Sequence, residues 1–363
     1  MGAAITIIAE AGVNHNGRLD LALRLVDAAA GAGANAVKFQ TFRAADLVSR
    51  HAPKAAYQQS LTNPEESQLA LLERLELDQA SHLMLADHCR QRGIAFLSTP
   101  FDAASLAFLV HGMGLETLKI PSGELTNGPF LLQVGATGKR ILLSTGLATL
   151  GEIETALGVL AFGLLALREP PSVAGCAAAF ASSEGRAALA GQVTLLHCTT
   201  EYPAPFGEVN LRAMDTMRQA FGLPVGYSDH TTGIVVPIAA AARGAVVIEK
   251  HFTLDRSLPG PDHPASLEPE ELTAMVEAIR VVEQAMGHGV KVPMASERKN
   301  RLVARKSLVA LEPIGQGERF SSANLGVKRP GSGLSPMEYW RLLGGVARRD
   351  YQPDECIDGG ERP

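Results

Sequence analysis

Short apolar runs alternate with stretches of helical spacing over the first 286 residues of the chain. Within the runs the apolar residues are almost continuous, as in ITIIA at 5–9 and ILL at 141–143. This pattern is typical of parallel strands that are covered on both faces. Eight such runs are present, at 5–10, 36–41, 95–100, 117–122, 140–145, 193–199, 224–229 and 246–252.

The stretches between the runs have the spacing of amphipathic helices. Leu19, Leu23 and Val26, for example, share one helix face. The other helical stretches span 65–92, 150–167, 211–221, 234–243 and 269–286. Eight strands separated by helices predict an α/β fold, a (β/α)8 TIM barrel. A doubly wound sheet is less well supported, because no glycine-rich dinucleotide fingerprint follows a strand.

The pattern changes after residue 286. We expect a TIM-barrel domain at 1–286, a linker at 287–300 that contains Gly and Pro, and a small β-rich domain at 301–363. A charged stretch at 297–305 is predicted to be helical, and short strands are predicted at 307–311 and 325–328. The Ala-rich segment 174–190 is read as a lengthened helical connection or an insertion, to which no function is attached.

Composition excludes several classes of protein. Hydrophobic residues make up 46% of the 363 and charged residues 20%, so the chain can form a large core and has no disorder signature. The net charge of -5 argues against a nucleic-acid or membrane-surface binder. The four cysteines form no CxxC pair, so neither a disulfide framework nor a structural zinc site is expected. No secretion signal is recognised at the N-terminus, which favours a cytoplasmic protein.

Polar residues follow nearly every predicted strand, at the barrel end where active sites lie. Solvent exposure explains one polar strand end, but it explains poorly a whole ring that carries carboxylates, lysines and histidines. The ring includes Glu10, Lys38, Gln40, Lys119, Ser122, Glu124, Ser144, Thr200, Tyr202, Ser228, His230, Glu249, Lys250 and His251. The sequence therefore predicts a functional mouth at this end.

Two kinds of chemistry are predicted there. Lys38 and Lys119, together with serine hydroxyls, suit a phosphate group, because charge-assisted hydrogen bonds are strong. His230 and His251 follow adjacent strands and could converge on one metal, with Glu10 and Asp262 as oxygen ligands or bases nearby. Two nitrogen donors, a carboxylate and open positions fit Mn, Zn or Fe. The competing histidines are His15, His197 and His263.

At these residues the sequence resembles the sialic acid synthases, that is, the N-acetylneuraminate synthases and the closely related legionaminic acid synthases. The resemblance covers essentially the whole chain. Its motifs are IAEAGVNHNG at 8–17, AVKFQTF at 36–42, FLSTPFD at 96–102, KIPSGELTN at 119–127, ILLSTGLA at 141–148, LLHCTTEYPAP at 195–205, VGYSDHTTG at 225–233, IEKHFTLD at 248–255 and PGPDHPAS at 259–266. Segments 303–310 and 327–340 resemble the antifreeze-like (SAF) domain that follows the barrel in this family.

The resemblance implies a reaction. Phosphoenolpyruvate would condense with open-chain N-acetylmannosamine and water to give N-acetylneuraminic acid and phosphate, with a divalent metal, most often Mn2+ (Mg2+ or Co2+ are alternatives). The motifs do not separate this enzyme from a legionaminic acid synthase, which uses 2,4-diacetamido-2,4,6-trideoxymannose. The discriminating contacts are expected in the loops around Tyr202 and on the SAF domain.

The resemblance also implies residue roles. His230 and His251 match the metal ligands, and Glu10, Glu124 and Lys119 match catalytic positions, with Glu10 or Glu124 as the base. Residues that match substrate-binding positions are Lys38, Gln40, Ser122, Ser144, Thr200, Tyr202, Ser228, Asp262 and Arg329. Some family members carry Asn where this chain has Thr200. Arg329 would reach a partner's barrel and contact the N-acyl group, which implies a domain-swapped homodimer.

Two further functions remain open at this point. A Schiff-base aldolase that uses free pyruvate would employ Lys119 or Lys250. A non-catalytic amino-sugar-binding protein is favoured only by the ice-binding character of the tail. A non-catalytic protein would be expected to have lost its metal-binding histidines, whereas His230 and His251 are both present in this chain.

Overall fold

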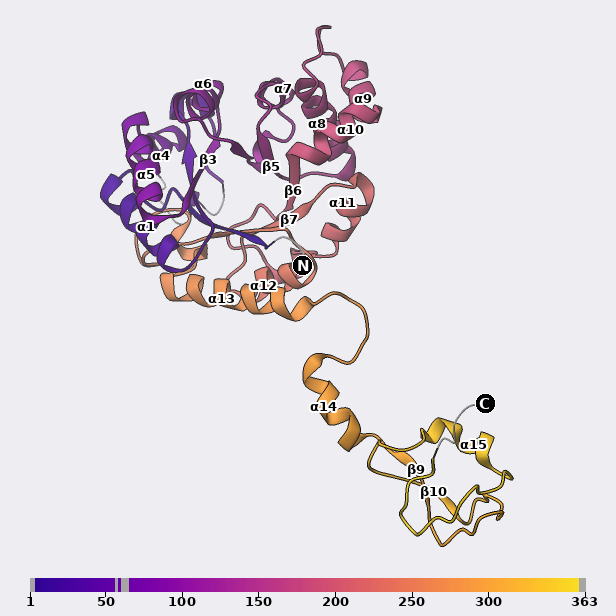
Figure 1. The fold of residues 1–363 in the computed structure, drawn as a ribbon. Coiled ribbons are helices and arrows are strands. Elements are labelled where there is room, and N and C mark those ends of the chain that lie inside the picture. Colours follow the sequence, from indigo (N-terminus) through magenta and orange to yellow (C-terminus); the bar gives the residue numbers. More distant parts are fainter. Residues whose placement is uncertain (1–3, 56–57, 60–64, 359–363) are drawn as a thin grey trace. The chain divides into compact units, whose positions relative to one another are not determined.

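A parallel sheet of eight strands forms the centre of the larger unit of the chain, which spans Met1–Gly287 (Figure 1). The computed structural model describes residues 4–55, 58–59 and 65–358. The strands are β1 Thr6–Gly12, β2 Ala36–Thr41, β3 Ala95–Pro100, β4 Thr117–Ile120, β5 Arg140–Ser144, β6 Val193–His197, β7 Val225–Asp229 and β8 Val247–His251. Their order is β3-β2-β1-β8-β7-β6-β5-β4, and the edge strands β3 and β4 pack side by side. The predicted barrel is therefore confirmed.

Helices cover the outside of the strands (Figure 1). They are α1 Leu19–Gly31, α2 Ala44–Leu47, α4 Gln68–Leu75, α5 Gln79–Arg92, α6 Ala103–Ala107, α7 Gly128–Ala136, α8 Leu150–Leu164, α9 Val173–Ala181, α10 Ser183–Gln192, α11 Ala213–Phe221, α12 Val235–Ala242 and α13 Pro269–Met286. No helix in the described part of the chain is long and apolar enough to cross a membrane.

One helical prediction needs correction. The stretch 65–92 is not one helix but two, because Asp78 accepts a hydrogen bond from the Ser81 amide at 2.8 Å and caps a new helix, α5. The Ala-rich segment agrees with its interpretation as a lengthened helical connection, because it forms two helices, α9 and α10, with Ser182 between them as the N-cap of the second. The sequence pattern does not predict α2, α6 or α7. Of these, α2 and α6 have only four and five residues, too few for a helical period to repeat.

Strand register brings the polar side chains together. Glu10 of β1 pairs with Lys38 of β2 on one side and with His251 of β8 on the other. On β7, Ser228 pairs with Glu249 of β8. Because neighbouring residues in register point to the same face of a sheet, these side chains share the barrel interior.

The second unit, His288–Pro363, has its own small core and is described by itself. It contains α14 Ala295–Ala304, an antiparallel pair of β9 Ser307–Ala310 and β10 Leu325–Lys328, and the short helix α15 Tyr339–Leu342. Its core residues are Leu308, Ala310, Ile314, Phe320, Leu325, Ala347, Tyr351 and Ile357.

Candidate active site

A cavity of about 320 Å³ lies where the predicted strand-end residues meet. Most of the predicted site residues line it. They are Glu10, Lys38, Gln40, Lys119, Ser122, Ser144, Tyr202, Ser228, His230, His251 and Asp262. The predicted mouth is thus a cavity, and these side chains come from seven of the eight strands or the loops that follow them.

A chain of buried charges crosses the cavity. Lys38 Nζ lies 2.6 Å from Glu10 Oε2 and 3.7 Å from Glu249 Oε2. Lys119 Nζ lies 3.2 Å from Glu249 Oε1, which also accepts a hydrogen bond from Ser228 Oγ at 2.8 Å. The two lysines are held by carboxylates in a water-poor site, where they can bind an anion strongly.

The two glutamates differ in proton affinity. Burial raises the pKa of Glu10 to about 7, although Lys38 opposes the shift. Burial also disfavours the charged form of Glu249, but Lys119 and Lys38 outweigh it and lower its pKa to about 2. One carboxylate therefore stays ionised while the other can exchange a proton near neutral pH.

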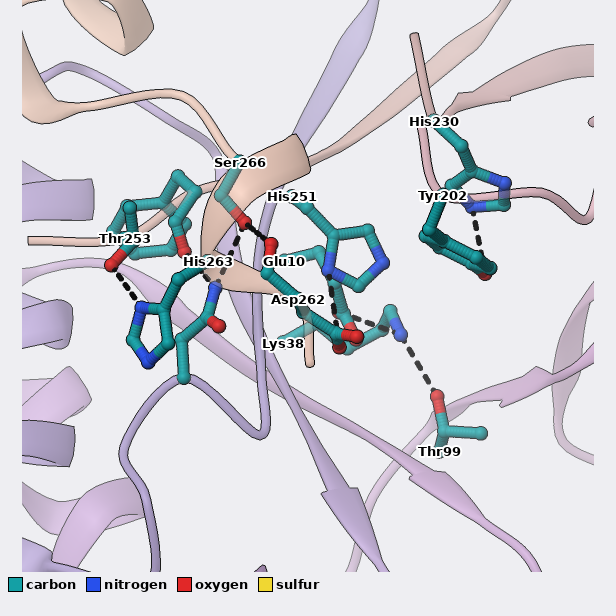
Figure 2. Close-up of polar contacts among 12 residues, drawn as sticks. Glu10, Lys38, Thr99, Tyr202, His230, His251, Thr253, Asp262, His263 and Ser266 are labelled. Carbon is teal, nitrogen blue, oxygen red and sulfur yellow. Dashed lines mark hydrogen bonds and ion pairs between the residues drawn. The ribbon is translucent and has the colours of Figure 1, made fainter. Parts of the chain in front are cut away.

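Two histidines form the other polar part of the cavity (Figure 2). The ring centroids of His230 and His251 are 5.6 Å apart. His230 Nδ1 lies 2.6 Å from the Thr199 carbonyl oxygen, which leaves Nε2 facing the Tyr202 hydroxyl at 3.2 Å. Burial lowers the pKa of His230 to about 4 and that of His251 well below its usual range. Both rings are therefore neutral at physiological pH and can donate a lone pair.

These residues fit a catalytic metal better than a structural one. Glu10 Oε1, His251 Cε1 and Asp262 Oδ2 all lie within 3.3 to 3.5 Å of where a side chain on Gly12 would begin, so a glycine keeps this corner open. His251 Nδ1 is buried and makes no hydrogen bond. Among the described residues no three His, Cys, Asp or Glu form a complete ligand cluster. Two histidines with open positions are compatible with a metal that also binds water or substrate.

A hydrogen bond from Ser266 fixes the backbone of Asp262 (Figure 2). Ser266 Oγ donates to the Asp262 carbonyl oxygen at 2.7 Å and accepts from Asn14 Nδ2 at 2.9 Å. Burial raises the pKa of Asp262 to about 6. The loop after β8 thus presents a carboxyl group beside His251, 3.8 Å from its Nδ1.

Comparison with known proteins places the chain in a family. Residues 25–291 match the NeuB family, and residues 305–359 match the SAF domain. The chain belongs to the NeuB family. It is an enzyme of the phosphoenolpyruvate-condensing sialic, legionaminic and pseudaminic acid synthase group, as the motifs predicted.

Relatives of this NeuB-family chain cover nearly its whole length. An N,N'-diacetyllegionaminic acid synthase of Campylobacter jejuni is 50% identical over 97% of this chain and 98% of the relative. An N,N'-diacetyllegionaminic acid synthase of Legionella pneumophila is 43% identical over 94% of this chain and 91% of the relative. The crystal structure of an N-acetylneuraminic acid synthetase from Leptospira borgpetersenii is 33% identical, covers 82% of this chain and 90% of that chain, and has a TM-score of 0.66.

Two predicted site residues of the first unit, Glu124 and Thr200, do not line the cavity. Glu124 lies in a 3-10 turn and accepts a hydrogen bond from Asn127 Nδ2 at 2.6 Å. Thr200 Oγ1 is buried without a hydrogen bond from any described residue and lies 2.2 Å from where a side chain on Gly146 would begin. Arg329 belongs to the second unit and is described within that unit alone, where it is exposed and its Nε donates to the Ala304 carbonyl oxygen at 3.1 Å.

The three competing histidines make hydrogen bonds outside the cavity. His197 Nε2 lies 2.7 Å from the Val209 carbonyl oxygen, and His263 Nδ1 lies 2.6 Å from Thr253 Oγ1. His15 Nδ1 accepts from the Gly17 amide at 3.0 Å. None of the three lines the cavity. This distribution favours His230 and His251 as the metal pair.

Lys250 also points away from the cavity. Its Nζ lies 2.5 Å from Asp229 Oδ2, and both side chains are fully buried. Alternation along β8 explains this placement, because Glu249 and His251 face the barrel interior and the residue between them faces the helices. Of the two candidate Schiff-base lysines, only Lys119 reaches the cavity.

Glu249 is the residue that the sequence prediction missed. The sequence pattern places Glu249 at a polar strand end but predicts no role for it. Its position two residues before His251 on a strand was the available signal, since residues i and i+2 share a face. Its contacts with both lysines make it the centre of the charged part of the cavity.

Proposed function

We propose that this protein is an N,N'-diacetyllegionaminic acid synthase, which condenses phosphoenolpyruvate with 2,4-diacetamido-2,4,6-trideoxymannose and releases phosphate. The observation that carries the choice of sugar is the 50% and 43% identity to two enzymes of that name, against 33% to the N-acetylneuraminic acid synthetase. N-acetylmannosamine, the sugar that the family resemblance implies, is the second candidate for the sugar substrate.

The charged part of the cavity suits phosphoenolpyruvate. Lys38 and Lys119 offset the charge of its phosphate and carboxylate, and hydroxyl groups add hydrogen bonds. The hydroxyls come from Ser122, Ser144 and Ser228. Gln40 and Tyr202 line the same cavity and are available to the sugar.

His230 and His251 would hold the divalent metal, Mn2+ in first place and Mg2+ or Co2+ as alternatives, with Asp262 beside them. When bound, such an ion polarises the aldehyde oxygen of the sugar. A carbon–carbon bond then forms between C3 of phosphoenolpyruvate and the aldehyde carbon, and water adds at C2. Glu10 accepts the proton of that water, because its raised pKa matches a base that works near pH 7. The proton that Glu10 accepts goes to the former aldehyde oxygen, which becomes a hydroxyl group. The bond between C2 and the phosphate oxygen then breaks as the new C2 hydroxyl gives its proton to the phosphate and becomes the keto group. Lys38 and Lys119 hold the departing phosphate.

A domain-swapped homodimer is part of the proposal. Arg329 of one chain would contact the N-acyl group in the barrel of the other, as the family resemblance implies. The proposal also includes a cytoplasmic location. It includes no nucleic-acid or membrane partner, in agreement with the net charge of -5.

Phosphate release tests the function. Purified protein with Mn2+ and phosphoenolpyruvate is given either the diacetamido sugar or N-acetylmannosamine, with and without a chelator. Chelator-sensitive release with a preference for the diacetamido sugar is expected. Preference for N-acetylmannosamine would transfer the assignment to N-acetylneuraminate synthesis, and no release with either sugar from folded, metal-loaded protein would overturn both readings.

A further inference from the structure

The cavity has a second, apolar part that the chemistry above does not use. It is formed by α2 and the residue after it, by α4, and by the end of β3. Its side chains are Leu47, Val48, Leu71, Leu72, Leu75 and Phe101. We call this set the apolar wall. The lysines, serines and histidines that handle phosphoenolpyruvate and the aldehyde all come from the barrel strands or from the residues directly after them.

The apolar wall is backed by a small hydrophobic cluster of its own. Leu71 and Leu75 are buried and pack with Val13 and Phe42, apart from the main barrel core. Phe42 and Phe101 contact edge to face with ring centroids 6.1 Å apart. The wall therefore has a fixed shape. Leu47, Val48 and Leu72 are only half-buried and present apolar surface to the cavity.

One polar group borders this apolar surface. Gln68, the first residue of α4, lines the cavity, and its Oε1 is buried without a hydrogen bond from any described residue. Capping of the helix does not require this amide, since Ser67 accepts from the Ala70 amide at 3.1 Å. An unpaired buried acceptor is costly, and a ligand N–H would remove that cost.

We propose that Gln68 and the apolar wall form the subsite for the end of the sugar that is distal to the aldehyde. The proposal rests on the proposed function and concerns the 4-acetamido group and the C6 methyl group. Gln68 would accept the N–H of the 4-acetamido group, and Leu47, Val48 and Leu72 would contact its methyl group and C6. With the aldehyde near the histidines and phosphoenolpyruvate near the lysines, the distal end is the part of the substrate that remains for this wall.

The same wall disfavours N-acetylmannosamine. That sugar carries hydroxyl groups at C4 and C6, and each loses hydrogen bonds to water when it is placed against leucine side chains. Gln68 can pair with one hydroxyl but not with both. Such sites discriminate through the polar groups that remain unpaired with the wrong substrate.

Two variants test the subsite. In Gln68→Leu the acceptor is lost, and kcat/KM for the diacetamido sugar should fall about tenfold, as expected for loss of one buried hydrogen bond. In Leu72→Asn the wall becomes polar, and the ratio of kcat/KM for the diacetamido sugar over N-acetylmannosamine should fall by a similar factor. The KM for phosphoenolpyruvate should not change in either variant. Gln91→Leu is the matched control, because Gln91 is exposed on α5 and bonds only to Asp87 among the contacts described for it.

The outcomes separate the two proposals. If the wild type prefers the diacetamido sugar and both variants keep its selectivity and kcat/KM while remaining folded, the subsite is wrong and the proposed function stands. If the wild type prefers N-acetylmannosamine, the proposed function fails and the subsite fails with it. A fall in kcat/KM for the diacetamido sugar in Gln68→Leu and a loss of selectivity in Leu72→Asn support the subsite, if the melting temperatures are unchanged and the control shows neither effect.

Discussion

The ammonium group of Lys38 lies 2.6 Å from the carboxylate of Glu10, and both side chains are buried in the barrel mouth. Lys38 is also 3.7 Å from Glu249, which in addition pairs with Lys119. Glu249 thus faces two cations, whereas Glu10 has one close cation. Burial outweighs a single cation but not two, so the pKa of Glu10 rises to about 7 and that of Glu249 falls to about 2. Carboxyl groups whose pKa values are driven apart are suited to different roles.

This pKa difference predicts the pH dependence of the reaction. If Glu10 is the base, it must be ionised, so kcat/KM should fall about tenfold per pH unit below about pH 7. Glu10→Gln should remove this limb and lower kcat by about 10² to 10⁴. Glu116→Gln, which changes an exposed carboxylate paired with Lys139, is the control and should keep the limb. A limb that persists in Glu10→Gln would assign the base to another residue.

The same shift affects stability in the opposite sense. The folded state binds the Glu10 proton more tightly than the unfolded chain, whose glutamate has a pKa near 4.5. The stabilisation is therefore fully present below about pH 4.5 and is lost as the pH rises through about 7. Urea unfolding of wild type and Glu10→Gln across this range measures it, since the variant should lack this pH-dependent component.

Lys119 should matter for phosphoenolpyruvate and not for the sugar. Lys119→Met removes one of two cations that face the anion and leaves Glu249 less well neutralised. We expect KM for phosphoenolpyruvate to rise about 100-fold, because a lost charge-assisted hydrogen bond to a buried group costs about 1.5–3 kcal/mol. Steady-state kinetics with each substrate varied in turn measures this effect. Lys139→Met, at an exposed ion pair, should change neither constant. An equal rise in both KM values would point to a general loss of the cavity.

The sequence predicted the barrel and most of the cavity because both depend on short-range patterns. Apolar runs indicate strands. The carboxyl ends of the parallel strands of a barrel meet at one face, independently of the length and number of the connecting helices. The break between α4 and α5 depends on one capping residue, Asp78. The helical spacing of apolar residues over 65–92 does not reveal this break. The pairing of Lys38 with both Glu10 and Glu249 depends on strand register, and continuous apolar runs without alternation do not indicate that register.

The two histidines should determine metal binding itself, independently of turnover. His230→Ala or His251→Ala removes one of the two neutral imidazoles, and Mn2+ affinity should fall by at least 100-fold. Electron paramagnetic resonance of free Mn2+ during titration measures binding without substrate. His88→Ala is the control, because His88 is a surface residue that pairs with Asp27. Unchanged Mn2+ affinity in both site variants would show that other residues hold the metal.

Lys250 should contribute to stability and not to covalent catalysis. In Lys250→Met the fully buried Asp229 carboxylate loses its cation, so the free energy of unfolding should fall by about 3–5 kcal/mol. Lys250→Met combined with Asp229→Leu removes both charges and should restore part of the loss. Denaturant unfolding measures both effects. Borohydride treatment with pyruvate should give no adduct at Lys250, and an adduct there would revive the aldolase mechanism.

Arg329 allows a test of the domain-swapped dimer. If the tail of one chain completes the barrel of the other, Arg329→Ala should raise KM for the sugar and leave KM for phosphoenolpyruvate unchanged. Arg341→Ala is the control, because Arg341 is an exposed arginine of the same unit that pairs with Glu338.

Mixing two defective chains then separates the arrangements. In a mixed dimer of Arg329→Ala and His251→Ala chains, a swapped architecture unites the intact barrel of the first chain with the intact tail of the second. One fully competent site forms in each mixed dimer, so activity at low sugar concentration should recover after the chains are unfolded together and refolded. If the tail serves its own barrel, every site carries one defect and mixing restores nothing. Recovery above the summed activity of the separate variants would therefore support the swapped dimer, and its absence in refolded mixed dimers would reject it.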